Sequence, residues 1–216
     1  MRNKIVLFSN MKGGTGKTTL LELFASYAIE KEVPVLAMDA DPQLSLYKDR
    51  LDDLQVNPEA SPSWLIKPIR VDENATAVIE KIKAVPGVVL IDCPGNIDNN
   101  YLQLLFKAAD VVVMPFRYDR KNVRETATFC GIFKMVNNKA QIVFVPNMVK
   151  SICEKRGELV DARNMAYDAF GKLGFITARI MERVELECCK TLSLNYKQRF
   201  EVKYAFEKIL QFIKKQ

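Results

Sequence analysis

Residues 5–19 read Ile-Val-Leu-Phe-Ser-Asn-Met-Lys-Gly-Gly-Thr-Gly-Lys-Thr-Thr and combine two structural signals. The apolar run at 5–8 is typical of a short strand buried on both faces. A glycine-rich turn follows, and a helical pattern runs from about Thr18 to Lys31. Such a turn aims several backbone N–H groups at one point in front of a helix, where phosphates bind. With Lys17 reaching the β- and γ-phosphates and Thr18 ligating Mg²⁺, the stretch predicts a nucleotide-phosphate site.

Further apolar runs of the same kind lie at 35–38, 88–91, 111–114 and 142–145, with helical patterns in most of the gaps. Strand–helix alternation with β-branched, non-alternating strands predicts an α/β fold: a mostly parallel, twisted sheet flanked by helices on both faces. We expect one domain over residues 1–216.

Several local predictions complete the fold. Residues 48–71, which contain three prolines, are expected to be irregular, and Asp72 is expected to cap a helix that runs to about residue 84. A short strand is expected near 175–180. Asp98 and Asp119 are candidate helix caps. The single tryptophan, Trp64, is either a core anchor or a partner contact.

The chain has no histidine, 32 Lys and Arg, and 26 Asp and Glu. The missing histidine excludes a catalytic imidazole base, a Ser–His pair and a His-ligated metal from this chain. Five cysteines without C-x-x-C spacing, including the adjacent Cys188 and Cys189, are typical of a reducing cytoplasm. No apolar run approaches the roughly 20 residues of a transmembrane helix.

Carboxylates follow two of the predicted strands. Asp39 and Asp41 come directly after the run at 35–38, and Asp92 follows the run at 88–91. Because ligands in parallel α/β sheets bind at the carboxyl ends of the strands, these groups are expected beside the glycine-rich turn. Asp92 is the candidate metal-linked carboxylate, acting through a water molecule.

The stretch Lys12-Gly13-Gly14-Thr15-Gly16-Lys17-Thr18 resembles the deviant Walker A motif of the ParA/MinD family of P-loop ATPases, and this resemblance implies the P-loop NTPase fold. Met11 stands where the common P-loop pattern has glycine, and Lys12 is the additional lysine. The resemblance implies that Lys12 crosses an ATP-sandwiched dimer interface and contacts the partner's nucleotide. It implies ATP and Mg²⁺ as cofactors and the following nucleotide-binding residues: Lys12, Gly13, Gly14, Thr15, Gly16, Lys17, Thr18, Thr19 and, at the adenine, Asn147.

The resemblance extends to the carboxylates, because residues 39–43 match the family's D-x-D-P-Q pattern. It implies that Asp41 positions the attacking water and that Asp39 supports the Lys17 and Mg²⁺ cluster. Lys12, Lys17 and Asp41 are therefore the candidate catalytic residues. Thr18, Asp39 and Asp92 are the candidate metal residues.

Two groups of cations are candidate contacts to DNA or a partner, with a solvated basic face as the alternative for the first group. Four cations lie at i, i+3, i+4 and i+7, the spacing of one helix face: Arg117, Arg120, Lys121 and Arg124. Three more lie where the resemblance is thin: Arg179, Arg183 and Lys190. In that region Glu185 stands where DNA-binding members often carry a basic residue.

The resemblance implies a cytoplasmic, slowly hydrolysing ATPase that a partner protein stimulates. It would form a homodimer on ATP, bind DNA non-specifically at the nucleoid, and partition a plasmid or other cargo. One alternative is a MinD-like membrane-surface ATPase using the amphipathic segment 202–216, which could instead pack on the sheet. Another is the ATPase module of a conjugation apparatus with a protein partner. A metabolic kinase is disfavoured, because no acceptor-substrate segment follows the motifs.

Overall fold

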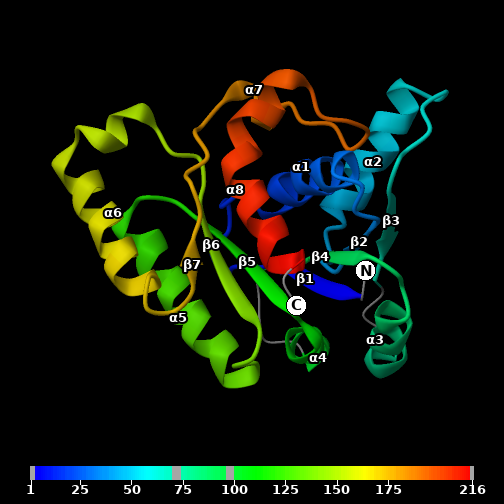
Figure 1. The fold of residues 1–216 in the computed structure, drawn as a ribbon, viewed down its shortest axis with the longest axis horizontal. Helices are drawn as coiled ribbons and strands as arrows, with labels where there is room; N and C mark the ends of the chain where they lie inside the picture. The colour runs from blue at the N-terminus through cyan, green and yellow to red at the C-terminus, as the bar shows by residue number, and fades with distance from the viewer. Residues whose placement is uncertain (1–2, 70–73, 96–99, 215–216) are drawn as a thin grey trace.

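The fold is built on a seven-stranded sheet in which every neighbouring pair is parallel (Figure 1). The computed structural model describes residues 3–69, 74–95 and 100–214. The strand order is β3-β2-β4-β1-β5-β6-β7. The strands are β1 (Lys4–Phe8), β2 (Val35–Asp39), β3 (Leu65–Pro68), β4 (Val88–Asp92), β5 (Val111–Phe116), β6 (Gln141–Pro146) and β7 (Phe175–Ile176).

Helices cover both faces of this sheet. They are α1 (Lys17–Glu30), α2 (Ser45–Val56), α3 (Ala75–Lys83), α4 (Asn100–Ala108), α5 (Arg120–Val136), α6 (Gly157–Phe170), α7 (Val184–Glu187) and α8 (Tyr196–Lys214), with a short 3-10 helix η1 (Ser151–Glu154). One buried cluster joins one face of the sheet to α3, α4, α5 and α6. A second joins the other face to α1, α2, α7 and α8, which lie above the sheet in Figure 1.

The central strands have no exposed position. β1, β4 and β5 are buried at every residue, as expected where both faces of a parallel strand are covered. The predicted P-loop NTPase-like architecture is therefore confirmed, as is the short strand near residue 175.

The prediction for residues 48–71 was wrong. This stretch contains most of α2 and the edge strand β3. α2 buries only Leu46 and Arg50, so it carries no apolar stripe that a periodicity test could detect. β3 has only four residues, alternates in exposure and ends at Pro68, which an edge position tolerates.

Trp64 is a core anchor. Its side chain is buried, and its indole N–H donates to the Ser26 hydroxyl over 3.2 Å. The Arg50 guanidinium lies 4.4 Å from the indole centre and also donates to the Trp64 carbonyl and to Thr191. Arg50 thereby ties α2 to the segment after α7.

Of the three predicted caps, one lies within the described residues. The Asp119 carboxylate accepts the Asn122 N–H over 2.8 Å at the start of α5, which confirms that cap. Asp72 and Asp98 lie outside the described residues. In the described part of α3, Asn74 caps the helix by accepting two backbone N–H groups.

The apolar face of α8 packs on the molecule. Val202, Phe206, Ile209 and Ile213 are buried, and the Phe206 ring meets Phe24 of α1 edge to face. This confirms packing on the sheet for the amphipathic segment, up to the end of α8. Across the described residues, no helix combines the length and apolarity needed to cross a membrane.

A buried carboxyl lies behind α1. Glu22 is 3% exposed and accepts the Cys189 S–H over 2.9 Å. Burial, with a smaller contribution from Asp49, raises the pKa of Glu22 to about 8. Between pH 4.5 and 8 the folded chain therefore retains a proton that the unfolded chain has lost, and the free energy of unfolding falls as pH rises.

We expect Glu22→Gln to remove this pH dependence, because glutamine has no proton to lose. The variant should gain on the order of 1–3 kcal/mol relative to wild type between pH 5 and pH 8. Urea unfolding of both proteins at the two pH values measures the difference. Parallel pH profiles for the two proteins would show that Glu22 does not retain its proton.

Candidate functional site

The loop between β1 and α1 has the backbone geometry of a phosphate cradle. Gly14 and Gly16 have φ of 69° and 81°, in the left-handed region that favours glycine. A Cβ at Gly13 or Gly14 would meet no heavy atom within 4 Å, so this part of the loop borders open space. The Thr15 hydroxyl donates to the Lys12 carbonyl over 3.4 Å and closes the loop on itself.

The N-terminus of α1 is left free for an anion. Gly16 occupies the N-cap position with no side-chain cap, and the first turn contains no acidic residue. The first backbone N–H groups and the positive end of the helix dipole therefore point at the loop, and no acidic side chain of the first turn itself competes for them. Lys17, Thr18 and Thr19 begin the helix and are each partly exposed.

Asp92 and Thr18 form the centre of the site. The strand register pairs Asp92 of β4 with Asp39 of β2, so the two carboxylates emerge from adjacent strand ends. The Thr18 hydroxyl donates to Asp92 Oδ2 over 2.7 Å. Burial raises the pKa of Asp92 to about 7, while the Thr18 bond and the nearby Lys17 act in the opposite direction.

The second oxygen of Asp92 gives a test for magnesium. Asp92 is 1% exposed, and its Oδ1 has no hydrogen-bond partner within the described part of the chain. A buried, unpaired carboxylate oxygen beside a threonine hydroxyl fits a hydrated Mg²⁺, which accepts few protein ligands and keeps several waters. No cluster of three His, Cys, Asp or Glu suited to a metal occurs among the described residues, so the fit rests on Thr18 and Asp92.

Asp39 positions the loop that carries Asp41. Both oxygens of the buried Asp39 accept backbone N–H groups, from Asp41 over 3.1 Å and from Tyr47 over 3.0 Å. Burial raises its pKa against these bonds. Asp41 itself is only half-buried and accepts the Gln43 N–H over 2.9 Å. The geometry thus gives Asp39 a positioning role and leaves the Asp41 carboxylate accessible.

Asn147 lies against the loop. Its side-chain N–H donates to the Thr15 carbonyl over 2.8 Å, and its backbone N–H donates to Phe116. A Cβ at Gly16 would come within 2.5 Å of Asn147 Nδ2, so a residue larger than glycine at position 16 would clash with the Asn147 side chain. The structure therefore makes Asn147 a support of the P-loop, and its predicted adenine contact stays a prediction.

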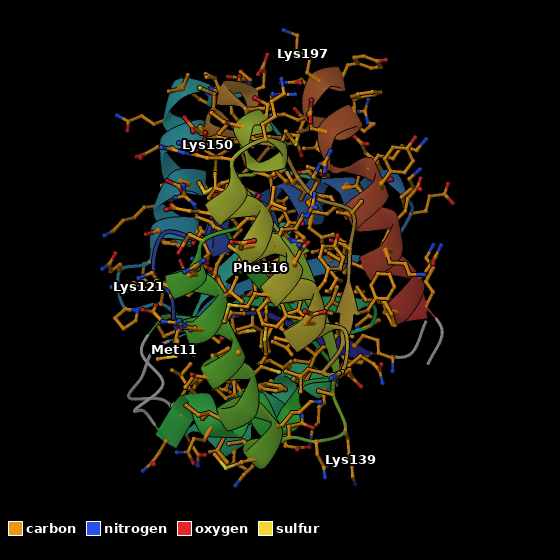
Figure 2. The ribbon with its side chains drawn as sticks, turned by 90° about the vertical axis from the view of Figure 1, so that its left-hand side faces the viewer. Met11, Phe116, Lys121, Lys139, Lys150 and Lys197 are labelled. Carbon is orange, nitrogen blue, oxygen red and sulfur yellow. The ribbon has the colours of Figure 1, made fainter. Side chains whose placement is uncertain are left out.

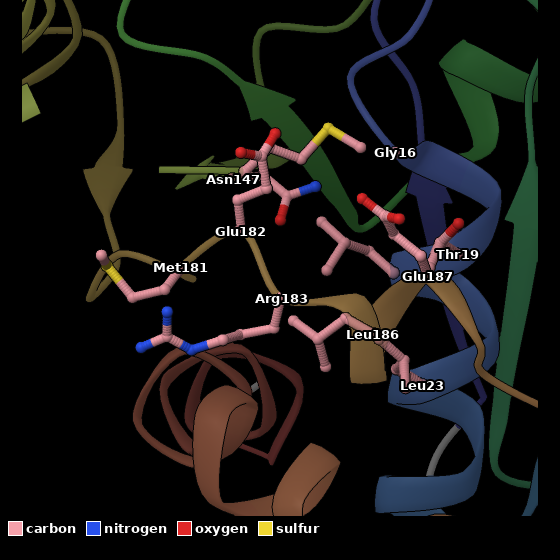
Figure 3. A pocket seen from close by; sticks show the side chains of 11 residues that line it. Gly16, Thr19, Leu23, Asn147, Met181, Glu182, Arg183, Leu186 and Glu187 are labelled. Atoms are coloured by element: carbon pink, nitrogen blue, oxygen red, sulfur yellow. The ribbon is translucent and has the colours of Figure 1, made fainter. Parts of the chain in front are cut away.

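A pocket opens between the start of α1 and the segment at 181–187 (Figure 3). It holds about 380 Å³ of space, its open mouth included. Its lining comprises Gly16, Thr19, Leu20, Leu23, Asn147, Met148, Met181, Glu182, Arg183, Leu186 and Glu187. The pocket lies beside Gly16 and Thr19, next to the loop that is predicted to hold phosphates. The sequence pattern did not predict that Met181 and Leu186 line a pocket, because their place beside α1 depends on the tertiary fold.

Lys12 extends from the loop toward α5. Its Nζ lies 3.2 Å from Glu125 Oε2, and the same carboxylate faces Lys121 at 4.0 Å. The first cationic group therefore lies only partly on α5. Arg120, Lys121 and Arg124 lie on α5, whereas Arg117 precedes the helix and donates its backbone N–H to the Asn122 side chain.

Placing Arg117 on one helix face with the others was thus wrong. The Asp119 cap begins the helix at Arg120, so regular spacing cannot extend back to Arg117. The remaining cations are partly neutralised, because Arg120 also pairs with Asp161 over 3.4 Å.

The second cationic group lies between β7 and α8. Arg179, Arg183 and Lys190 are exposed. Arg183 lies 3.1 Å from Glu201, and Lys190 lies 3.9 Å from Asp53. Their predicted contact with DNA stays a prediction.

Comparison with known proteins decides the family. The model of the CobQ/CobB/MinD/ParA nucleotide-binding domain matches residues 6–187. The chain belongs to this family. The match includes the P-loop, all three aspartates and the pocket segment, and it confirms the family resemblance.

Relatives of this family member include proteins named replication protein A. Those from Rhizobium rhizogenes and Sinorhizobium fredii are each 34% identical, over 98 and 97 residues. Each match covers 44% of this chain and 23% of the relative, so the chain spans under a quarter of those proteins.

Solved structures of similar fold cover almost the whole chain. MinD from Aquifex aeolicus has a TM-score of 0.76 at 19% identity, covering 96% of this chain and 97% of MinD. A plasmid partition protein from Borrelia burgdorferi has 0.66 at 15%, covering 98% and 99%. Cobyrinic acid a,c-diamide synthase from Mycobacterium smegmatis, with an ATP analogue and magnesium, has 0.71 at 18%, covering 99% and 96%. At these identities the likeness shows the fold.

Proposed function

We propose that this family member is a ParA-type, Mg²⁺-dependent ATPase that acts as a dimerising switch. The observation that carries the proposal is the hydrogen bond from Thr18 to the buried Asp92, directly under a glycine-rich loop. The second oxygen of Asp92 has no hydrogen-bond partner among the described residues. Asp41 stands accessible at the neighbouring strand end. The ATP analogue and magnesium in the Mycobacterium synthase support the same ligand class.

Each residue has a role in this proposal. The loop amides and Lys17 hold the β- and γ-phosphates, and Thr18 with Asp92 holds the hydrated Mg²⁺. The ion, when bound, would neutralise charge on the phosphates. Asp41 orients the attacking water, for which position matters more than basicity. Lys12 of one chain reaches the nucleotide of the other and stabilises negative charge there.

The biological output we propose is partition or positioning of a plasmid or similar cargo. The ATP-bound homodimer would bind DNA non-specifically, so it would collect at the nucleoid in the cytoplasm, and a partner protein would speed its slow hydrolysis. The named function of the Borrelia protein and the replication-protein relatives support this choice. The cations at Lys121, Arg124 and Arg179 are candidate phosphate contacts.

DNA retention with ATP against ADP tests this output. We expect the chain to bind duplex DNA in ATP and Mg²⁺ and not in ADP, with affinity that falls steeply between 50 and 200 mM salt as counterions are released. Gel-shift titrations over that salt range provide the measurement. No binding in ATP at the lowest salt would contradict the DNA assignment and favour a protein partner, as in a conjugation module.

The membrane alternative loses its proposed contact surface. The face of 202–216 that would enter a bilayer is the face that packs on α1, as far as the described residues extend. Binding of the full chain to anionic phosphatidylglycerol vesicles in ATP, without DNA binding, would restore that alternative.

A further inference from the structure

We propose that Glu125 holds Lys12 within its own protomer and thereby sets how readily two ATP-loaded chains join. This inference rests on the proposed function, because it concerns the lysine assigned to the partner's nucleotide. It adds a residue that belongs to none of the nucleotide motifs, and it joins the loop to the basic helix α5.

The ion pair is close and partly shielded from water. Lys12 Nζ and Glu125 Oε2 are 3.2 Å apart, and each side chain is 30% exposed. Opposite charges at this separation and burial attract more strongly than fully exposed pairs, because solvent and salt screen them less. By comparison, Arg120 and Asp161 form a pair on the same side of the fold with side chains 60% and 64% exposed.

The folded core fixes both ends of the pair. The Lys12 backbone N–H donates to Asn10 Oδ1 over 3.1 Å. The amide nitrogen of the same buried Asn10 donates over 2.8 Å to the hydroxyl of Thr126, the residue after Glu125. It also donates over 2.8 Å to the Pro115 carbonyl. Asn10 thus links the backbone of Lys12 to Thr126 on α5. Because Thr126 is next to Glu125, this link holds the Lys12 backbone close to the Glu125 side chain.

The charge on α5 makes this carboxylate distinctive. The helix sequence is RKNVRETATFCGIFKMV, in which Glu125 is the only acidic residue among several cations. Its second neighbour is Lys121, 4.0 Å away. Figure 2 shows Lys121 and Met11, which precedes Lys12, at the same edge of the molecule. A carboxylate between two lysines at this edge counters the repulsion that Lys12 would otherwise meet from α5.

The consequence concerns the approach of a second chain. A lysine that must contact the partner's nucleotide has to leave Glu125 first. The apparent affinity between chains is therefore the intrinsic affinity multiplied by the fraction of molecules in which Lys12 is released, so a smaller released fraction weakens the dimer. Partly exposed ion pairs change such a fraction about 2- to 5-fold. A symmetric dimer releases two pairs, so the effect on dimerisation is squared.

Glu125→Gln tests the inference in the full chain. The substitution keeps the shape and removes the charge, and we expect the dimer dissociation constant in ATP and Mg²⁺ to fall about 4- to 25-fold. Sedimentation velocity over a concentration series measures it. Glu125→Asp retains the carboxylate and should lie closer to wild type. Asp161→Asn makes the same charge change on α6 without touching Lys12 and should match wild type.

The Lys12→Ala background separates the pair from a general effect of charge. There the second substitution Glu125→Gln should change nothing. An unchanged dissociation constant for Glu125→Gln or an equal shift for Asp161→Asn would overturn the inference, and so would dimerisation of the double variant when Lys12→Ala alone stays a single chain. A wild-type ATP dimer would still support the proposed function in each case. A wild-type chain that never dimerises in ATP would overturn both.

Discussion

Replacing Lys17 with alanine is expected to weaken ATP binding on the order of 10²-fold and to bring hydrolysis below detection. Lys17 opens α1 at the uncapped helix end, so its ammonium group is placed to bond two phosphates at once. Hydrogen bonds between charged groups contribute about 1.5–3 kcal/mol each. No other residue of α1 is a cation, and the next lysine, Lys31, follows the far end of the helix. Titration calorimetry with ATP and Mg²⁺ measures the loss.

The structure adds a reason for the size of the Lys17 effect. Lys17 opposes the burial that raises the pKa of Asp92 to about 7. Without the lysine, that pKa rises further, less of Asp92 is ionised at neutral pH, and the Mg²⁺ side of the site weakens as well. Lys31→Ala, at the other end of α1, is the matched control. Equal ATP affinity for both variants and wild type would contradict the assignment of the phosphate site.

Asp41→Asn is expected to slow hydrolysis by about 10²-fold while ATP binding persists. The asparagine oxygen can still accept the Gln43 N–H that Asp41 Oδ1 accepts, so the loop keeps its shape. The loss falls on the negative charge that orients water and not on the phosphates. Single-turnover hydrolysis of radiolabelled ATP, with binding measured in parallel, separates the two steps.

The same substitution should accumulate the ATP-bound state. If that state is the dimer, Asp41→Asn remains dimeric after wild type has returned to single chains. Gln43→Ala removes the neighbouring side chain but leaves the backbone N–H that Asp41 bonds, so its turnover should stay near the wild-type rate. Wild-type turnover in Asp41→Asn would exclude Asp41 as the residue that orients the water.

The centre of the site could be predicted from sequence because it lies where local signals coincide. β1 is buried at all five residues, and the loop after it must contain glycine where φ is positive. Thr18 and Asp92 are 74 residues apart, yet parallel pairing of β1 with β4 brings them within a hydrogen bond. A parallel sheet places all the carboxyl ends of its strands at one edge, so the strand pattern alone predicts that Asp92 lies near the loop.

Other features depend on tertiary contacts that leave no periodic trace. Glu125 has the pattern of an ordinary helix surface residue, and only the fold shows Lys12 against it. Glu22 lies among apolar residues of α1, and that local sequence does not predict its hydrogen bond from Cys189. The edge strand β3 is too short and too exposed to show a strand pattern in the sequence. Arg117 lies outside α5 because the cap at Asp119 makes the helix begin at Arg120.

We propose that ATP joins two of these chains through Lys12, and light scattering during size-exclusion chromatography measures whether it does. The chain has a mass of 24.6 kDa. We expect wild type to show twice that mass in ATP and Mg²⁺ and the single-chain mass in ADP, whereas Lys12→Ala remains a single chain in both. A single-chain mass for ATP-saturated wild type would show that ATP does not join the chains, and full dimerisation of Lys12→Ala in ATP would show that Lys12 is not what joins them.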